Sequence, residues 1–208
     1  MQSTTTAVVH TVLAGLLALC VSVPSAAQNS DAVTTVDNLH AALLDTMKNA
    51  KTLGYGGRRD RIAPVVEASF DLVFITRFTL GRYWADLGTE QRAIMVEALR
   101  RLTIANYASR FDGYSGERFE TKSSKPARKG RELVRTVLVV NNDVADNVTL
   151  DYLLEETAGS WRIVNVVANG VSDLSLKRAD YGAIIKTQGV DSLLARLNGQ
   201  IADLESDR

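Results

Sequence analysis

The fold class is decided by one stretch of sequence, NVTLDYLLEETAGSWRIVNVVA, which spans residues 147–168. In its first half every second side chain is apolar and the side chains between them are mostly polar, which is the period of a half-buried strand. A second apolar run follows after Ala158-Gly159-Ser160. So short a turn joins antiparallel strands rather than parallel ones. The stretch therefore predicts a β-hairpin with strands at 147–155 and 161–168.

Two more strands are predicted upstream, at Glu117–Thr121 and Leu133–Val140, where the period of two recurs. The turn signal Asn141-Asn142-Asp143 connects the second of them to the hairpin. Strands joined by connections this short form an antiparallel meander and not parallel strand-helix-strand units.

Helical spacing occupies the chain before the sheet. Apolar residues recur at steps of three and four from Val33 to a helix end near Gly54, and Gly54-Tyr55-Gly56-Gly57 is a predicted break. Pro64 suits the first turn of a second helix, which is expected to continue to Gly81.

A short element at Tyr83–Leu87 precedes a long helix, for which Thr89 is the expected N-cap and Asp112-Gly113 the end. Helical spacing returns from Ser172 to Leu204 and is interrupted at Gly189. Helices, then an antiparallel sheet, then helices again indicate an α+β domain.

The composition excludes several classes of protein. The 208 residues are 46% apolar and 23% charged, with 24 Lys and Arg against 24 Asp and Glu. Such a chain is not a disordered polar protein, a disulfide scaffold or a multi-pass membrane protein. Its zero net charge removes the simplest electrostatic case for nucleic-acid binding. One globular domain is expected.

The amino-terminal segment resembles a secretory signal. Residues 1–27 contain no Asp, Glu, Lys or Arg, and the apolar run Val12–Val23 is shorter than the ~20 residues that a membrane-spanning helix needs. Cleavage after Ala27 is expected, which leaves a single domain at 28–208. The only cysteine, Cys20, is then removed, and Leu19 before it does not fit the signal of a lipoprotein.

The sequence contains few histidine and cysteine residues, two types that commonly act in catalysis. Besides His10 in the predicted signal, the chain has only His40, which is expected to be a partly exposed helix residue. Without cysteine or a second histidine, the common zinc sites and nucleophile-base pairs cannot form. Asp71 is the one carboxylate with suitable apolar neighbours, and a structural hydrogen bond is its expected role. No nucleotide or calcium motif is present, so no cofactor and no metal are expected, and the chain is predicted to bind rather than to catalyse.

A single sheet with one apolar face must cover that face with helices or leave it as the wall of a pocket. The aromatic and aliphatic residues of both helical regions fit either role, as core or as pocket lining. A secreted chain without catalytic residues favours a dry cavity suited to hydrocarbon.

An ordered series of residues carries a resemblance to a known family. The series is Phe70-Asp71, Leu80-Gly81 with Trp84, Gln91, Tyr107-Ala108, Tyr114, and Val171-Ser172 after Gly170. It resembles the MlaC-like family of periplasmic phospholipid-binding proteins, also called toluene-tolerance auxiliary proteins, over essentially the whole mature chain. Within that family, the segments 107–111 and 169–174 are most similar to the hopanoid-biosynthesis-associated branch called HpnM.

The resemblance implies an α+β fold in which a curved antiparallel sheet of about four strands is covered by N-terminal and C-terminal helices around an apolar cavity, NTF2-like or cystatin-like in outline. It implies a monomeric periplasmic carrier of a Gram-negative bacterium, which binds lipid tails and makes transient contact with an ABC-type transport complex of the inner membrane. Where phospholipid-carrying members usually have a Tyr-Arg pair followed by Phe, this chain has Lys177-Arg178 and Tyr181. The cargo is therefore expected to be a phospholipid or a hopanoid.

The residues expected to contact lipid are apolar or aromatic. They are Phe70, Phe74, Phe78, Tyr83, Trp84, Met95, Leu99, Leu102, Val137, Val139, Leu150, Tyr152, Val164, Val166, Val171 and Tyr181. Two other classes of function stay open at this point: a small-molecule enzyme with a cavity on a similar fold, and a structural or assembly subunit with a filled core.

Basic residues cluster between Lys122 and Arg131, in the predicted connection of the first two strands. This connection is either an ordinary solvated loop or a contact with anionic headgroups or an acidic docking surface. The candidate headgroup or docking residues are Lys125, Arg128, Lys129, Lys177 and Arg178. Arg58-Arg59 and Arg100-Arg101 are expected to be ordinary exposed charges.

Overall fold

The structure is a computed structural model, and it describes residues 31–140 and 146–206. The predicted signal with Cys20, its cleavage point and the turn Asn141-Asn142-Asp143 lie outside the described residues.

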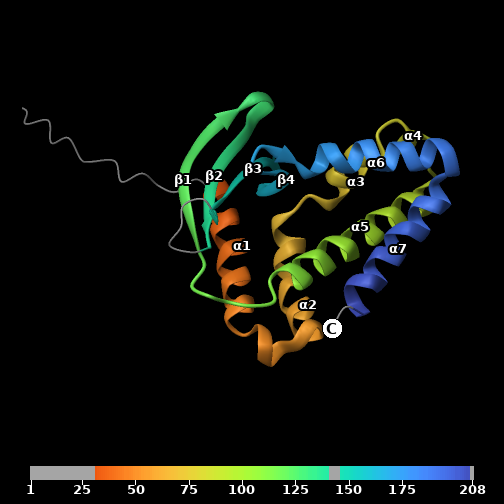
Figure 1. The fold of residues 1–208 in the computed structure, drawn as a ribbon. Helices are drawn as coiled ribbons and strands as arrows, with labels where there is room; N and C mark the ends of the chain where they lie inside the picture. The colour runs from red at the N-terminus through yellow and green to blue at the C-terminus, as the bar shows by residue number, and fades with distance from the viewer. Residues whose placement is uncertain (1–30, 141–145, 207–208) are drawn as a thin grey trace, which may run out of the picture.

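Five helices precede the sheet (Figure 1): α1 (Asp31–Lys48), α2 (Ala50–Ser69), α3 (Leu72–Leu80), α4 (Tyr83–Asp86) and α5 (Thr89–Arg110). The predicted helix end near Gly54 is confirmed, because Gly54 leaves helical geometry, with φ 56°, and forms a kink inside α2. The break is shorter than predicted, since residues 55–57 are helical. Pro64 lies inside α2 and not in a first turn. Its side chain is exposed, so the ring points to solvent and the helix loses only the hydrogen bond that proline cannot donate.

The predicted single helix from Pro64 to Gly81 is two helices. Phe70 between them is extended and forms a parallel bridge with Ile163 of the sheet. The backbone N–H of Asp71 donates to the Ile163 carbonyl at 3.0 Å, and the Asp71 carboxylate accepts from the Phe74 N–H at 2.8 Å. This N-cap confirms the structural role predicted for Asp71. A tertiary hydrogen bond to the sheet therefore ends α2 where the apolar spacing would let it continue.

The N-cap of the long helix lies one residue before the predicted position. Gly88, and not Thr89, is the N-cap of α5, and its N–H donates to Oε1 of Gln91 at 3.1 Å. Arg58 is also not an exposed charge. It is buried, and its Nε donates to the Ala108 carbonyl at 2.8 Å, which ties α2 to the end of α5.

The sheet is an open antiparallel meander of five strands, in the order β1 (Arg118–Ala127), β2 (Arg131–Val139), β3 (Val148–Thr157), β4 (Ser160–Ala168) and β5 (Val171–Ser172). The predicted hairpin, its turn and the meander are confirmed. The first strand is longer than predicted, so most of the basic connection is strand, and only the 3₁₀ turn η1 (Arg128–Gly130) joins β1 to β2. Figure 1 shows that this hairpin extends beyond the helices.

Helix α1 packs on one face of the sheet, where β3 supplies Tyr152 and Leu154. Buried residues of α1, α2 and this face form the first core, with Ile104 of α5. On the opposite face, the exposed Arg135 pairs with Asp151 at 2.7 Å.

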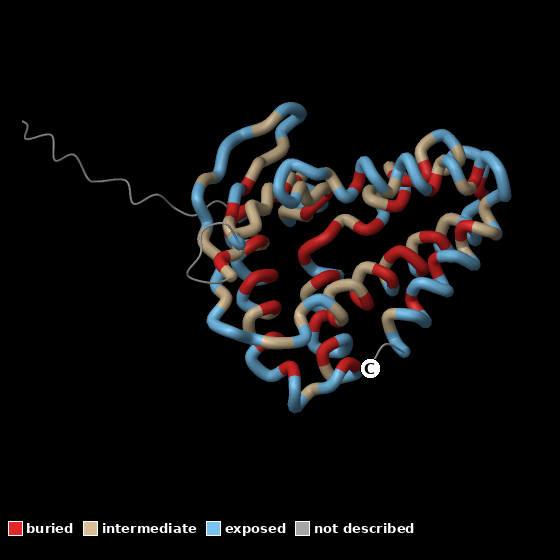
Figure 2. Tube along the Cα trace, viewed as in Figure 1, coloured by how far each residue is buried: buried red, intermediate tan, exposed pale blue. Residues whose placement is uncertain are grey.

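Two helices, α6 (Asp173–Gln188) and α7 (Val190–Ser206), follow the sheet. Gly189 between them has φ 86°, a conformation that glycine adopts without strain, and it confirms the predicted interruption. Residues of α7 pack with α5 and α6 in a second core that contains no strand residue. Figure 2 shows buried residues on both sides of the molecule, along α1 and α2 and along α5 and α7.

Candidate functional site

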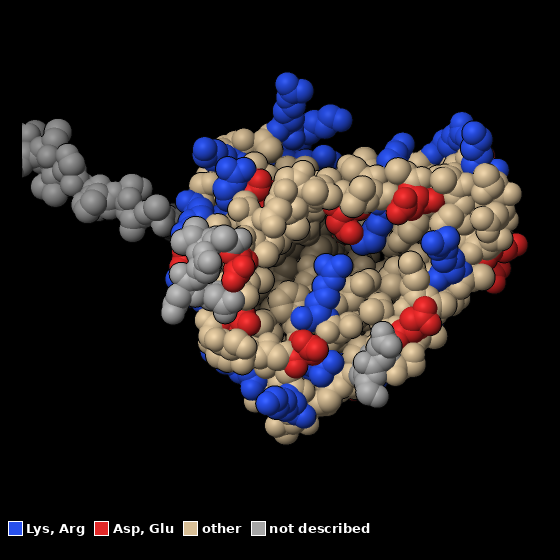
Figure 3. All heavy atoms as spheres, viewed as in Figure 1, with Lys and Arg blue, Asp and Glu red and all other residues tan. Residues whose placement is uncertain are grey.

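A hollow opens between the two packed regions. Figure 3 shows it at the centre of one face, over the junction of α1, the sheet and α5. Uncharged residues form most of its visible wall, and a basic side chain stands at its mouth. Helix α5 connects the two sides, because Ile104 belongs to the first core whereas Leu99 and Leu102 belong to the second.

The first core supplies apolar side chains that pack against it and still keep part of their surface accessible. They are Ala63, Val65, Ile75, Tyr107, Phe111, Phe119, Leu150, Trp161 and Val166. Side chains packed on one side and accessible on the other are the usual lining of a cavity that binds hydrocarbon. These residues are therefore the candidates for the wall of the hollow.

A histidine and a tyrosine form a polar pair inside this apolar region. Nε2 of His40 lies 3.0 Å from the hydroxyl of Tyr152, and the imidazole stacks on Phe119 with ring centroids 3.9 Å apart. Burial lowers the pKa of His40 to about 4, so the ring is neutral at neutral pH. The expectation that His40 is partly exposed is wrong, because the sheet covers the helix face that carries it.

Tyr107 places a second phenol in the same region. Its ring centroid lies 5.9 Å from that of Phe70 and 5.7 Å from that of Phe111. Burial raises the pKa of Tyr107, and the negative charge of Asp173 at the start of α6 raises it further. Among the described residues its hydroxyl has no hydrogen-bond partner, while the side chain as a whole is only partly buried against the first core. This is the arrangement expected for a residue that borders a hollow.

The strand residues predicted to contact lipid divide between the two faces of the sheet. Tyr152 pairs with Val166, and both lie with Leu150 on the face that α1 covers. Val137 pairs with Thr149, which places Val137 on the opposite face, and Val139 follows two residues later on that same face. The sequence pattern could not separate these sets, because β2 is apolar on both faces.

Two other residues predicted to contact lipid, Val164 and Val171, lie in β4 and β5, where strand pairing is irregular or short. Val164 has no partner in the β3–β4 register, since Asn165 and Ile163 pair with consecutive residues across a bulge, and its side chain is buried. Val171 in the short β5 is 53% exposed. The structure does not bring these two together with Tyr152.

The predicted lining residues of the helices are mostly in the second core. Met95, Leu99, Leu102 and Tyr181 are buried there, with Tyr83 and Trp84 packed against them. Their apolar spacing on α5 matches α7 rather than the sheet, because the two helices pack side by side (Figure 1). The structure therefore does not bring these residues together with the strand residues, and their contact with lipid stays a prediction.

The aromatic residues before α4 also divide. Phe70 belongs to the first core, whereas Phe74 and Phe78 form a stacked pair with centroids 6.2 Å apart under the guanidinium groups of arginines. Arg131 lies over Phe74, and Arg178 lies over Phe78 at 4.7 Å from the centroid. Cation-π contacts hold these rings at the surface, away from the first core.

The predicted headgroup or docking residues occupy two places. Lys125, Arg128 and Lys129 are exposed on the β1–β2 hairpin, and none forms an ion pair with a described residue. Lys177 instead pairs with Asp173 one turn earlier on α6. Arg178 donates to the Phe78 carbonyl at 2.7 Å.

The predicted lipid-contact residues include only Leu150 and Val166 of the candidate wall. The other wall residues are absent from that set: Ala63, Val65, Ile75, Tyr107, Phe111, Phe119 and Trp161. Phe119 had a signal, because it lies in a strand that the sequence predicts. Phe111 and Ile75 had none, since Phe111 follows the end of a helix and Ile75 belongs to a helix whose start depends on a tertiary hydrogen bond.

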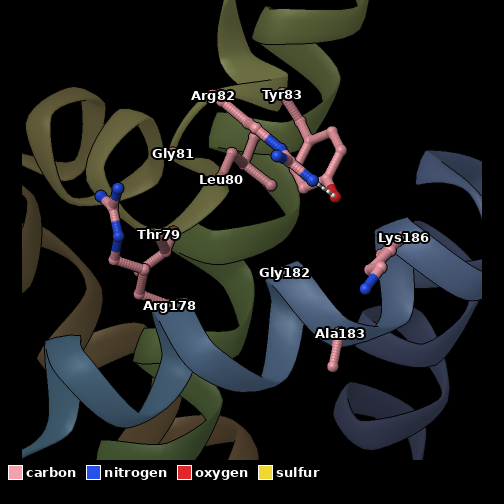
Figure 4. A pocket seen from close by; sticks show the side chains of 9 residues that line it. All are labelled: Thr79, Leu80, Gly81, Arg82, Tyr83, Arg178, Gly182, Ala183 and Lys186. Atoms are coloured by element: carbon pink, nitrogen blue, oxygen red, sulfur yellow. Dashed lines mark hydrogen bonds between the residues drawn. The ribbon is translucent and has the colours of Figure 1, made fainter.

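Two small surface pockets accompany the hollow. One of about 340 Å³ lies between the α3–α4 turn and α6 and is lined by Gly81, Arg82, Arg178 and Lys186 among others (Figure 4). The other, of about 300 Å³, lies between α6 and α7. Within residues 31–140 and 146–206, no helix is long and apolar enough to cross a membrane, and no acidic, histidine or cysteine cluster could hold a metal ion.

Comparison with known proteins gives this arrangement a family. Residues 37–199 match the family model of the MlaC protein. This chain belongs to the MlaC protein family. The match names no branch of the family, so membership of the hopanoid-associated branch stays a prediction.

Two proteins similar to this MlaC family member are informative. The intermembrane phospholipid transport system binding protein MlaC of Haemophilus influenzae is 24% identical over 120 residues, which are 57% of this chain and 56% of that protein. This chain thus spans a little over half the length of that relative in the match. A phospholipid-binding protein from Ralstonia solanacearum, solved in complex with a phospholipid, has a TM-score of 0.71 and 22% identity over 85% of this chain and 100% of that chain. The two chains share one fold.

Proposed function

We propose that this chain is a periplasmic lipid carrier that holds the acyl tails of a phospholipid in the hollow between its two cores. The observation that carries the proposal is the hollow itself, bordered by partly accessible apolar side chains in a chain of the MlaC family. A protein with the same fold has been solved with a phospholipid bound, which supports the choice of cargo.

The physical need for a carrier follows from the cost of exposing lipid tails to water. Two sixteen-carbon tails contain roughly 30 methylene-type groups, and at ~0.8 kcal/mol each their exposure costs about 24 kcal/mol. A dry apolar hollow replaces the bilayer as a solvent for the tails, so transfer between membrane and protein can be nearly balanced. Direction then has to come from a partner, and the ABC-type transport complex of the inner membrane is the partner proposed.

The polar groups near the hollow fit the polar end of such a cargo. The partly buried Tyr107 has no hydrogen-bond partner for its hydroxyl among the described residues, so this hydroxyl is available to an ester or a hydroxyl of the lipid. A hopanoid, which is polycyclic and rigid, would fill the same hollow with different contacts. It is the second cargo proposed, on the Lys177-Arg178 departure from the usual family sequence.

The test is mass spectrometry of an organic extract of the purified protein, together with its masses under native conditions. About one phospholipid per chain is expected. Hopanoid in the extract would keep the carrier function and change the cargo, whereas protein that is free of lipid, and that takes up none from vesicles, would contradict the carrier function. An unrelated periplasmic protein purified from the same cells serves as the control for carried-over lipid.

A further inference from the structure

One edge of the molecule carries eight cations from separate parts of the chain. We call this set the basic ridge, and its members are Lys125, Arg128, Lys129, Arg131, Arg77, Arg178, Arg82 and Lys186. Figure 3 shows groups of Lys and Arg side chains along the upper edge of the view, over the β1–β2 hairpin and the side of the molecule that carries α6. The ridge therefore combines residues from parts of the chain that are far apart in sequence.

The stacked rings of Phe74 and Phe78 connect three members of the ridge. The guanidinium carbons of Arg131 and Arg77 lie 5.2 and 5.6 Å from the centroid of Phe74. Phe74 stacks on Phe78, and Arg178 lies over Phe78. Guanidinium groups held over rings are pre-positioned and weakly hydrated, and their remaining N–H groups are available to phosphate oxygens.

The ridge continues from Arg178 into the pocket of Figure 4. A side chain on Gly81 would bring a Cβ to 3.1 Å from Nη2 of Arg178, so the approach of this guanidinium depends on a residue without a side chain. Beyond it, Arg82 reaches the Tyr83 hydroxyl at 3.0 Å, and Lys186 extends from the next turns of α6 toward the same pocket.

Few carboxylates compensate these charges, although the pKa of the Arg82 guanidinium is raised by its hydrogen bond to the Tyr83 hydroxyl and, more weakly, by the nearby Asp86. Of the eight cations, only Arg131 forms an ion pair with a described residue, with Glu155 at 2.7 Å. The chain as a whole has zero net charge, so the ridge is a local excess of positive charge. Like charges gathered without partners repel one another, and an anionic surface removes that repulsion.

Apolar surface accompanies the charge. Val73 is 56% exposed and lies one turn before Arg77 on α3, the helix that also carries the partly accessible rings of Phe74 and Phe78. Cations beside exposed aliphatic and aromatic groups are the combination that binds the interface of an anionic bilayer. We propose that the basic ridge is a docking surface for an anionic bilayer, at which the carrier meets a membrane directly. The inference rests on the proposed function, because a lipid carrier that serves a complex in the membrane works close to a lipid surface.

The test is sedimentation of the purified chain with vesicles of phosphatidylcholine alone and with vesicles that contain 30% phosphatidylglycerol. Binding is expected only to the anionic vesicles, and it should weaken strongly when NaCl is raised from 20 to 300 mM, because salt screens exposed charges. The variant Lys125→Gln/Arg128→Gln/Lys129→Gln should bind at least tenfold less at low salt. Arg77→Gln/Arg82→Gln should lose several-fold.

A matched control removes three exposed cations elsewhere, as Lys51→Gln/Arg101→Gln/Arg196→Gln, none of which forms an ion pair with a described residue. It changes the net charge as the hairpin variant does, and it should keep binding within twofold. Equal losses in both variants would reduce the effect to net charge and overturn the proposal, as would wild-type protein that ignores anionic vesicles. Thermal unfolding verifies that each variant is folded. If the purified chain contains lipid in its organic extract but does not bind vesicles, the membrane-docking role of the basic ridge is contradicted and the carrier function is not.

Discussion

The two cores of this protein consist of the same kinds of apolar residue, but only the first core borders the hollow. In the second core, helices pack on helices, and Leu99, Leu193 and Leu197 are almost completely buried. In the first core, helices pack on a sheet, and side chains such as Leu150 and Tyr107 remain partly accessible. Each core also contains residues of the other kind, since Leu39 and Leu154 of the first core are completely buried and Leu194 of the second is only partly buried. Apolar content alone therefore does not distinguish a wall from a core; the partner of each side chain does.

Truncation of the second core should have the largest effect. Leu197 on α7 is completely buried, so Leu197→Ala should lower the free energy of unfolding by about 2–5 kcal/mol. Leu150→Ala, beside the hollow, should cost clearly less, because its side chain already contacts open space. Urea unfolding followed by circular dichroism compares the two variants. Similar losses would show that the hollow is as tightly packed as the second core.

Acid should weaken the first core through His40. In the folded chain this imidazole has a pKa of about 4, against about 6.5 when exposed in the unfolded chain. Between these values only the unfolded chain takes up the proton. The stabilisation is therefore complete above pH 6.5, falls as the pH falls, and levels off below pH 4, with a total loss of about 3 kcal/mol.

Chemical unfolding at pH 7.5, 5.5 and 4.5 measures this dependence, with His40→Gln as the comparison. The variant keeps a polar group near Tyr152 but does not titrate, so its stability should fall less over the same range. Parallel curves for the two proteins would mean that carboxylates, and not His40, cause the acid sensitivity.

Sequence patterns predicted the sheet better than the site, for physical reasons visible in single residues. The alternation from Val148 to Leu154 and the turn at Gly159 are local signals, and the structure confirms the hairpin. The end of α2 is not local, because the carbonyl of Ile163 binds the N–H of Asp71 from nearly a hundred residues away in the chain. The same limit applies to the wall of the hollow. Helical spacing identifies Leu99 as inward-facing, but only the fold shows that inward means toward α7.

Enlarging a side chain should separate the two cores further. Leu150→Trp is expected to fill part of the hollow, lower the lipid recovered per chain several-fold and leave the fold intact. Leu99→Trp adds the same bulk to a closed core, so it should cost about 1–3 kcal/mol in stability. Lipid content per folded molecule, measured with the unfolding midpoint, distinguishes the cases. If Leu150→Trp retained full lipid, Leu150 would not be part of the binding wall.

Removing one hydroxyl gives the smallest and most local comparison. Tyr152→Phe leaves His40 buried without its partner, so it should cost about 1–2 kcal/mol. Tyr107→Phe removes a hydroxyl that has no partner among the described residues, so the stability of the lipid-free protein should change by less than about 0.5 kcal/mol. Its effect should appear in binding instead. The wild type should take up ester-linked lipid better than ether-linked lipid, and Tyr107→Phe should lose that preference. Uptake of both lipids by the two proteins, measured by titration, gives that ratio. A Tyr107→Phe protein with an unchanged ratio and lower stability would place the hydroxyl in the packing of the core and not at the hollow.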